Sequence, residues 1–278
     1  MKITQNAFLD SPNKAVTLMG MSGVGKTTMT ALLHRDQWFH YSGDYRIGTK
    51  YLEEPILDNI KRQAMQVPFL SDLIRSDSIY FSNNITVENL KPISSFLGKI
   101  GNPQLGGISL LEFKRRQALH RAAEANAMTD VADFIDKAQE IYGYPHFIND
   151  TGGSVCELTD EEAWDDLAQR SIIIYLKADE HMETAMFERA KADPKPLYYD
   201  TDFLDQHVEE FLVNNNLVNV EQMVPDEFVQ WVFPKLLAYR KPLYEGIANK
   251  HGYTIDASGV LDLKTQADVL EFIGSALD

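Results

Sequence analysis

The chain has 278 residues, of which 44% are hydrophobic and 24% charged, so it can bury the core of one large or two small domains and is neither a disordered tail nor a fibrous repeat. Its 41 acidic residues against 26 basic ones give a formal charge of -15, which repels phosphate backbones and anionic lipid, so we expect neither a nucleic acid nor a membrane as partner. Because it has one cysteine, no apolar run of membrane-spanning length and no signal-peptide pattern, we expect the protein in the cytoplasm.

The first predicted element is a buried strand at residues 15–19, which leads through a glycine-rich turn into a helix over 25–34. The clearest strand is the isoleucine-rich run at 171–176, because uninterrupted β-branched runs are typical of parallel sheets covered on both faces. Further strands are predicted at 38–41, 146–149 and 253–256, and a last helix over 266–277.

Two helical additions interrupt this alternation. Residues 52–142 are predicted to form a helical insertion on the acceptor side, with helices over 110–128 and 129–141. A second helical insertion is predicted over 200–235. Because no repeat or flexible linker separates these parts, we expect residues 1–278 to fold as a single domain.

A glycine-rich segment follows the first predicted strand. Gly20, four intervening residues and then Gly25-Lys26-Thr27 match the phosphate-binding loop, or P-loop, and the strand and helix around it are the context that the motif requires. Lys26 is expected to reach the β- and γ-phosphates and Thr27 to offer its hydroxyl to Mg²⁺. The expected fold class is therefore α/β, a three-layer α/β/α P-loop NTPase fold with a mainly parallel sheet and a helical insertion. The residues expected to bind the nucleotide are Gly20, Ser22, Gly23, Val24, Gly25, Lys26, Thr27 and Thr28.

Polar residues also follow the later strands, at 42–44, 150–154 and 177–179. In parallel α/β sheets, chemistry gathers beyond the carboxyl ends of the strands. Asp44 is suited to orienting or deprotonating a substrate hydroxyl, and the glycines in 150–154 can bring backbone amides against a bound molecule. A simpler interpretation stays open, in which Asp44 caps a helix and the glycines only form a tight turn.

The order of these motifs resembles the shikimate kinase family, within the wider group of P-loop small-molecule and nucleotide kinases. The P-loop is specific by itself, whereas the other blocks are short and gain weight from their order. Together they cover somewhat over half of the chain. The blocks that carry the resemblance lie at 20–28, 41–44, 150–154, 173–198 and 240–245.

The resemblance implies a P-loop kinase with ATP and Mg²⁺ as cofactors and a small-molecule acceptor. It implies that Asp44 contacts the acceptor hydroxyl and that Gly152 and Gly153 contact the acceptor through their backbone. Arg240 corresponds to a ligand of the acceptor's carboxylate. A further protein partner is left unspecified.

The same resemblance implies a mobile lid over residues 186–200, with Arg189 and Lys195 as its cations. Phosphoryl transfer needs cations around the γ-phosphoryl group and the exclusion of water, so a basic lid fits this chemistry. The predicted catalytic residues are Lys26, Asp44, Arg189 and Lys195.

The chain departs from the family pattern at its metal site and its lid. Ser42 stands where the family has an aspartate that assists the metal, and we hypothesise that Asp150, with Thr27, takes over the metal-facing role. Lys195 replaces an arginine and so exchanges a planar fork for a point charge.

The insertions imply an acceptor other than shikimate. Arg116, with Arg115 and Arg121 beside it, is a candidate for holding an anionic acceptor, although basic residues on a helix more often form a solvated face or pair with acids. Cys156 is interpreted as a small buried residue, and the histidines lack the spacing of a transition-metal site.

These observations predict an ATP-dependent phosphotransferase that moves the γ-phosphoryl group to a hydroxyl of a small polar, anionic acceptor. Two alternatives stay open. One is a nucleoside or nucleotide kinase, because the insertions could build a base pocket. The other is a nucleotide-binding regulatory or scaffold protein with little transferase activity, which the loss of the acid at Ser42 favours.

Overall fold

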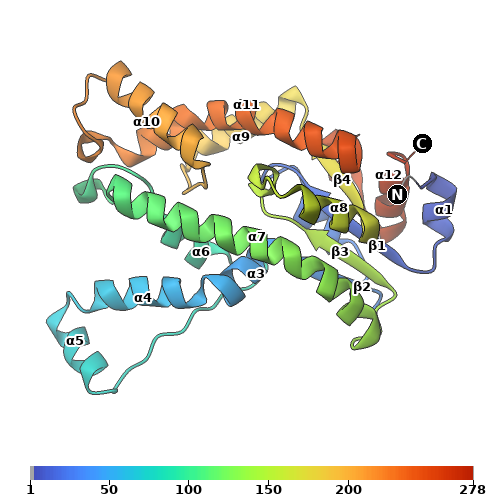
Figure 1. Cartoon of the computed structure of the whole chain (residues 1–278), viewed down its shortest axis with the longest axis horizontal. Helices are drawn as coiled ribbons and strands as arrows, with labels where there is room; N and C mark the ends of the chain where they lie inside the picture. The colour runs from blue at the N-terminus through green and yellow to red at the C-terminus, as the bar shows by residue number, and fades with distance from the viewer. Residues whose placement is uncertain (1–2, 278) are drawn as a thin grey trace. The chain divides into compact units, whose positions relative to one another are not determined.

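The structure is a computed structural model that describes residues 3–277 (Figure 1). Residues 1–2 and 278, the ends of the predicted 1–278 domain, lie outside the described part. The boundaries expected for the insertions at 52–142 and 200–235 and for the lid stay predictions. Contacts divide the chain into a sheet unit, Met1–Gly43, Glu124–Pro194 and Val229–Asp278, and a helical unit, Asp44–Ala123 and Lys195–Phe228.

The sheet unit is built on five parallel strands in the order β2-β3-β1-β4-β5. The predicted α/β fold is thereby confirmed, and the sheet is parallel throughout. In β4, Ile173, Ile174 and Leu176 are all 0% exposed, as expected for a strand with both faces covered. The strands are β1 (Lys14–Met19), β2 (Trp38–Ser42), β3 (His146–Asp150), β4 (Ile172–Lys177) and β5 (Gly252–Asp256).

The path of the chain changes direction at β1. From β1 the chain crosses to β2, returns to β3 beside β1, and continues to β4 on the other side of β1. Ligands of open parallel sheets bind beyond the carboxyl ends of the strands at such a point. In register, Asp150 at the end of β3 pairs with Leu18 of β1 on one side and with Ser42 of β2 on the other. The ends of these three strands therefore lie level with one another.

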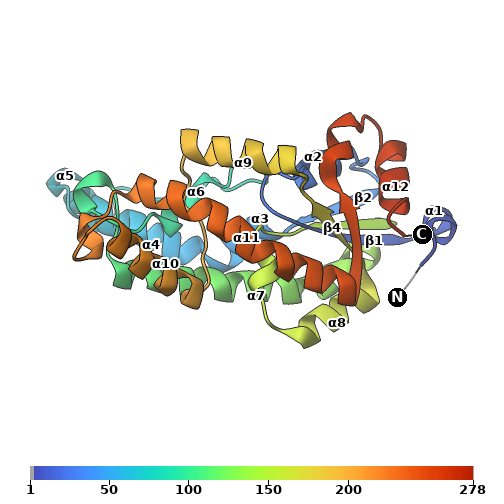
Figure 2. The same ribbon diagram turned by 90° about the horizontal axis from the view of Figure 1, so that it is seen from above.

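Helices cover both faces of the sheet (Figure 2). Helices α2 (Lys26–Ala31) and α12 (Gln266–Gly274) lie on one side, and α8 (Glu161–Arg170) lies on the other. Side-chain caps fix where two of them begin: Asp160 accepts a backbone hydrogen bond at the start of α8, and Thr265 does the same for α12 within a capping box. The three-layer arrangement predicted from the strand and helix order is present.

Two long helices have one part in each unit. They are α7 (Leu110–Glu140) and α11 (Pro225–His251). The sequence predicts two helices where α7 forms one, so that prediction is wrong. Neither glycine nor proline interrupts α7, and the Thr129 hydroxyl donates to the carbonyl oxygen of Ala125 at 3.1 Å, so this polar side chain is satisfied within the helix.

The helical unit consists of short helices around an aromatic core. The Tyr199 ring lies within 6.2 Å of the rings of Phe113, Phe203 and Phe228, centroid to centroid. These aromatic contacts join both chain segments of the unit. Its helices are α3 (Gly43–Arg46), a π-helix (Ile47–Tyr51), α4 (Glu53–Ala64), α5 (Pro68–Arg75), α6 (Lys91–Leu97) and α10 (Thr201–Asn214), with Gly43 itself counted in the sheet unit.

Across residues 3–277, none of the helices combines the length and the apolar character that crossing a membrane requires.

Candidate functional site

The P-loop lies between β1 and α2, at the carboxyl end of the central strand. Gly25 caps α2 with a φ of 100°, a left-handed conformation that glycine adopts without strain. A Cβ built on Gly25 would lie 2.5 Å from the Val260 side chain, so any larger residue would push the loop from its place. Within the loop, Val24 is buried, and Ser22 and Thr28 are exposed.

Lys26 is a buried cation in this loop. It is 7% exposed, and its Nζ donates to the carbonyl oxygens of Gly20 at 2.7 Å and Met21 at 3.4 Å. No carboxylate among residues 3–277 pairs with this ammonium group. Burying a charge without a counter-ion is costly, so this position favours an anionic ligand.

Arg189 brings a second cation to the same loop. It lies on α9 (Glu180–Ala192), which begins at the capping residue Asp179. A Cβ built on Gly23 would lie 2.6 Å from Nη2 and 3.0 Å from Nη1 of Arg189, so the guanidinium lies directly against the loop backbone. Its Nε donates to the carbonyl oxygen of Ala185 at 3.4 Å. In the described part of the chain it has no carboxylate partner.

Thr27 and Asp150 form the oxygen-rich side of the site. The Thr27 hydroxyl donates to Oδ2 of Asp150 at 2.8 Å, and Asp150 is 7% exposed. Ser42, where the resemblance expects an acid, is the register partner of Asp150 on β2. The carboxylate thus lies one strand away from the expected position and at the same level of the sheet.

A hydroxyl and a carboxylate in contact are ligands of the kind that Mg²⁺ takes in P-loop proteins, where water and phosphate oxygens complete the coordination. Thr27 and Asp150 therefore fit the metal that the resemblance implies. Within residues 3–277, no three His, Cys, Asp or Glu side chains cluster as a metal site.

The glycine turn after β3 lies against the P-loop. A Cβ built on Gly153 would lie 2.7 Å from the Ser22 hydroxyl oxygen. The start of this turn is tied to β1, because the Thr151 hydroxyl donates to the Leu18 carbonyl oxygen at 3.0 Å. The predicted backbone-contact residues Gly152 and Gly153 are therefore next to the predicted nucleotide loop.

Arg240, predicted to bind a carboxylate of the acceptor, already has one beside it. It is 4% exposed, and its Nε donates to Oε1 of Glu157 at 2.5 Å. Burial by itself lowers the pKa of Arg240, but the interactions with Glu157, Cys156 and Tyr244 together outweigh this effect and raise the pKa above its ordinary value. Glu157 is the residue that the sequence reasoning missed. Its position four residues after Gly153 gives no local signal of a partner 83 positions away.

Cys156 is buried in the same segment. Burial raises the pKa of its thiol to about 12. The side chain is 5% exposed, in keeping with its interpretation as a small buried residue rather than a nucleophile.

The other predicted site residues belong to the helical unit. Asp44 lies half-buried in the first turn of α3. Lys195 is exposed, in the segment without helix or strand that follows α9. The roles predicted for Asp44 and Lys195 stay predictions.

Arg116 is held inside the helical unit. It is 6% exposed, and its guanidinium donates to Glu112 at 2.8 Å, to the Phe96 carbonyl oxygen at 2.6 Å and to Asn59 at 2.9 Å. Asn59 also lines a cavity of about 400 Å³ in this unit. The cation that lines this cavity is Lys91, which the sequence reasoning did not single out. The remaining polar lining residues are Ser82, Asn83, Asn84, Asn89 and Ser95.

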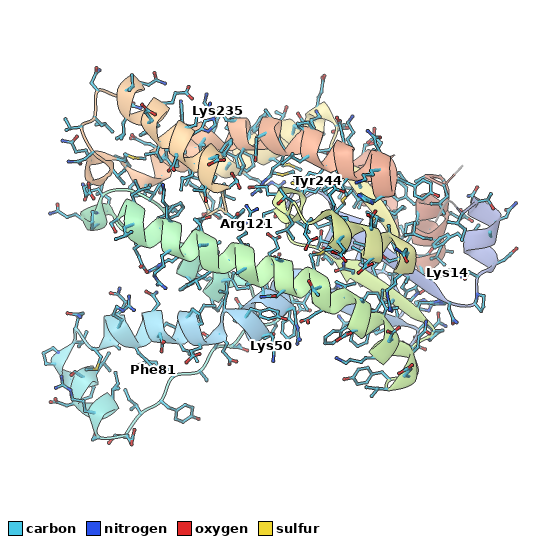
Figure 3. All side chains as sticks on the ribbon, in the orientation of Figure 1. Lys14, Lys50, Phe81, Arg121, Lys235 and Tyr244 are labelled. Atoms are coloured by element: carbon cyan, nitrogen blue, oxygen red, sulfur yellow. The ribbon has the colours of Figure 1, made fainter. Side chains whose placement is uncertain are left out.

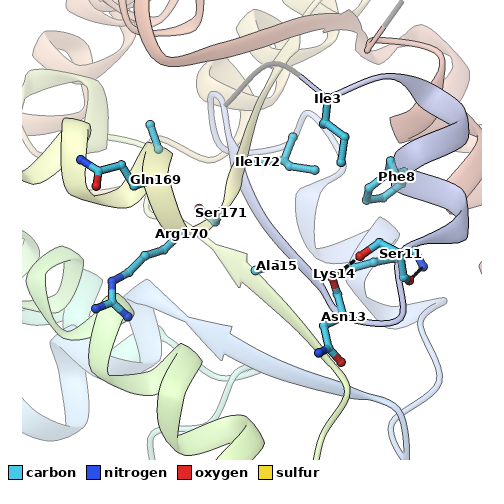
Figure 4. A pocket seen from close by; sticks show the side chains of 11 residues that line it. Ile3, Phe8, Ser11, Asn13, Lys14, Ala15, Gln169, Arg170, Ser171 and Ile172 are labelled. Carbon is cyan, nitrogen blue, oxygen red and sulfur yellow. Dashed lines mark hydrogen bonds between the residues drawn. The ribbon is translucent and has the colours of Figure 1, made fainter.

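A smaller cavity lies in the sheet unit, at the amino ends of β1 and β4 and so at the end of these strands away from the P-loop (Figure 4). Its volume is about 200 Å³, and Phe8, Lys14 and Arg170 are among its lining residues. Burial lowers the pKa of Lys14, whose Nζ donates to the carbonyl oxygen of Ser11 at 2.5 Å. Because this cavity faces the amino ends of the strands, it is separate from the P-loop.

No protein-family model matches the chain, and none of the curated proteins matches it significantly. Among solved structures, shikimate kinase from Bacteroides thetaiotaomicron is similar at 13% identity with a TM-score of 0.41, over 94% of this chain and 95% of that one. Shikimate kinase from Acinetobacter baumannii, in complex with shikimate, is similar at 14% identity with a TM-score of 0.33, over 85% of this chain and 99% of that one. At these values neither likeness is an argument for a particular activity of this chain.

Proposed function

We propose that this chain is an ATP-dependent phosphotransferase that moves the γ-phosphoryl group to a hydroxyl of a small polar acceptor. One observation carries the proposal: Lys26 and Arg189 reach the same glycine loop, and among residues 3–277 neither has a carboxylate partner. This pair lies in a chain whose net charge is -15. Two cations that lie at one loop without acidic partners favour a ligand with several negative charges, such as a triphosphate.

The two cations have different tasks in this proposal. Lys26, buried in the loop, binds the β- and γ-phosphates. Arg189, exposed on α9, stabilises the charge that develops on the γ-phosphoryl group during transfer. Such a division suits a reaction in which catalysis consists mostly of positioning and charge stabilisation.

Mg²⁺ would be held by the Thr27 hydroxyl and the Asp150 carboxylate, which are in contact at 2.8 Å. The ion, when bound, neutralises charge on the phosphates. Asp150 takes the part that an acid at Ser42 would have taken.

The acceptor oxygen bonds to the γ-phosphorus as the bond from that phosphorus to the β-phosphate oxygen breaks, and ADP leaves. The acceptor's proton passes to Asp44, the proposed base. The backbone of Gly152 and Gly153 orients the acceptor, and Lys195 contributes a further cation from the lid segment.

Two experiments test this function. One is a binding titration with a fluorescent Mg·ATP analogue, and the other is an ADP-production assay over a panel of sugar acids, polyols, nucleosides and nucleotides. Lys26→Ala should weaken nucleotide binding about ten- to a hundredfold, because it removes charge-assisted hydrogen bonds to two phosphates. Arg189→Ala should lower kcat at least about a hundredfold with a smaller effect on nucleotide affinity. Lys191→Ala is the matched control, since Lys191 lies on the same helix but pairs with Glu188.

Failure of the wild type to bind any nucleoside triphosphate, or unchanged binding by Lys26→Ala, would refute the proposal. Phosphorylation of nucleosides or nucleotides alone would favour the nucleotide-kinase alternative. Tight nucleotide binding without transfer to any acceptor would favour a regulatory protein, the alternative that Ser42 in place of an acid supports.

A further inference from the structure

One carbonyl oxygen in the glycine turn accepts two hydrogen bonds from the same helix. Arg240 donates from Nη1 to the Gly153 oxygen at 3.0 Å, and the Tyr244 hydroxyl donates to it at 2.9 Å. Arg240 and Tyr244 are four residues apart on α11, so they lie on the same face of the helix (Figure 3 labels Tyr244). Together with Gly153 they form what we call the turn clamp.

Glu157 fixes the arginine of the turn clamp. The Arg240 side chain is 5% exposed and the Glu157 side chain 2% exposed, and the two are joined at 2.5 Å. A charge-assisted hydrogen bond in such surroundings holds the guanidinium in one orientation. The positive charge is thereby compensated inside the protein, so little of it is left to attract a carboxylate of an acceptor.

The turn that the clamp holds and the strand end that leads into it each contact the P-loop segment. At Gly153, a built Cβ would lie 2.7 Å from the Ser22 oxygen and 3.2 Å from the Ser22 nitrogen. At the strand end before the turn, Asp150 accepts the hydrogen bond of Thr27 at 2.8 Å. A displacement of the turn would therefore move both the loop backbone at Ser22 and the carboxylate beside Thr27.

We propose that Arg240 and Tyr244 are positioning residues, which hold the Gly153 turn against Ser22 and so keep the P-loop in its nucleotide-binding shape, and that Arg240 does not bind the acceptor. This inference rests on the proposed nucleotide-binding function. It reassigns the arginine for which the family resemblance implies contact with the acceptor.

The test compares two pairs of variants and one further double variant by Mg·ATP-analogue affinity and by amide hydrogen exchange of residues 20–25, in the full chain. Tyr244→Phe, which deletes one clamp hydroxyl, should raise Kd about fivefold and speed exchange in the loop. Tyr175→Phe is the control. Its ring stacks on that of Tyr244 at 5.0 Å and is similarly buried, but its hydroxyl does not contact Gly153.

The second pair tests the contact between turn and loop. Gly153→Ala should raise Kd about tenfold, because the added Cβ overlaps the Ser22 oxygen. Gly153→Ala combined with Ser22→Ala removes that oxygen and should bind the nucleotide about as well as Ser22→Ala alone, a rescue that general destabilisation would not produce. Thermal unfolding checks that each variant is folded at the assay temperature.

Arg240→Met alone would leave Glu157 buried without its partner, so it is made together with Glu157→Gln. This double variant should also raise the nucleotide Kd, by about tenfold. Wild-type nucleotide affinity and loop exchange in Tyr244→Phe and in the double variant, with only the acceptor KM raised by the latter, would overturn the proposal. Amide hydrogen exchange of the P-loop can be measured without a nucleotide. A wild type that binds no nucleotide would therefore refute the proposed function, whereas the exchange rates would still show whether the turn clamp holds the loop.

Discussion

The acid that serves the proposed metal site lies one strand away from where the family resemblance places it. Asp150 and Ser42 are register partners at the ends of β3 and β2. An acid at either position would therefore lie at the carboxyl ends of the strands. Backbone pairing keeps the two side chains at one level. The contact of Asp150 with Thr27 at 2.8 Å then provides two oxygen ligands in one place.

Asp150→Asn should therefore weaken nucleotide binding in the presence of Mg²⁺ about tenfold and leave metal-free binding almost unchanged. The amide keeps an oxygen that can accept the Thr27 hydrogen bond but loses the negative charge that the ion needs. Restoring an acid on the neighbouring strand, in Asp150→Asn with Ser42→Asp, should recover part of the Mg²⁺ dependence. Isothermal titration with and without Mg²⁺ measures both effects. If the nucleotide affinities of Asp150→Asn and of the wild type depended equally on Mg²⁺, Asp150 would not be a ligand of the metal.

The strands and the P-loop were predictable because their signals are local. An uninterrupted apolar run such as 172–176 needs no distant residue to be recognised as a buried strand, and a glycine-lysine-threonine spacing needs only its own loop. The proximity of Asp150 to Thr27, 123 residues apart, was predictable through the rule that strand ends gather at one edge. No such rule connects Glu157 to Arg240, because that pair depends on how α11 packs.

Helix α7 begins with an ion-pair network that gives the helical unit a predictable pH response. Hydrogen bonds from Arg115 and then Arg116 outweigh the opposing effect of burial and lower the pKa of Glu112 from 4.5 to about 2. Since the pKa is lower in the folded chain than in the unfolded one, Glu112 stabilises the fold fully above about pH 4.5, and this stabilisation is lost as the pH falls towards 2.

Glu112→Gln should lower the free energy of unfolding by about 1–2 kcal/mol at pH 7, less than the full shift implies because the side chain is 26% exposed. Urea unfolding should give the same difference at pH 5 and a clearly smaller one at pH 3.5. Glu140→Gln, at the other end of α7, serves as the control and should change stability by less than about 0.5 kcal/mol. If the stability difference between wild type and Glu112→Gln did not become smaller at pH 3.5, the contribution of Glu112 to stability would not depend on its negative charge, and the prediction would be wrong.

At the scale of the whole molecule, the net charge of -15 opposes the approach of an anionic nucleotide. This repulsion acts over long distances and is screened by salt, since the Debye length falls from about 30 Å at 0.01 M to about 8 Å at 0.15 M. The attraction by Lys26 acts only near contact, and at 7% exposure its charge is screened much less. The two opposing effects therefore differ in their response to ionic strength.

Association of a fluorescent Mg·ATP analogue should accordingly become faster by about two- to threefold between 10 and 150 mM KCl, measured by stopped flow, because the repulsion weakens more than the local attraction. The corresponding analogue of adenosine, which has no phosphates, should associate at nearly the same rate in both salts and separates electrostatics from other salt effects. A rate that falls steeply with salt would mean that a wider positive field guides the nucleotide. In that case Lys26 and Arg189 would attract the nucleotide together with further cations of the protein rather than by themselves.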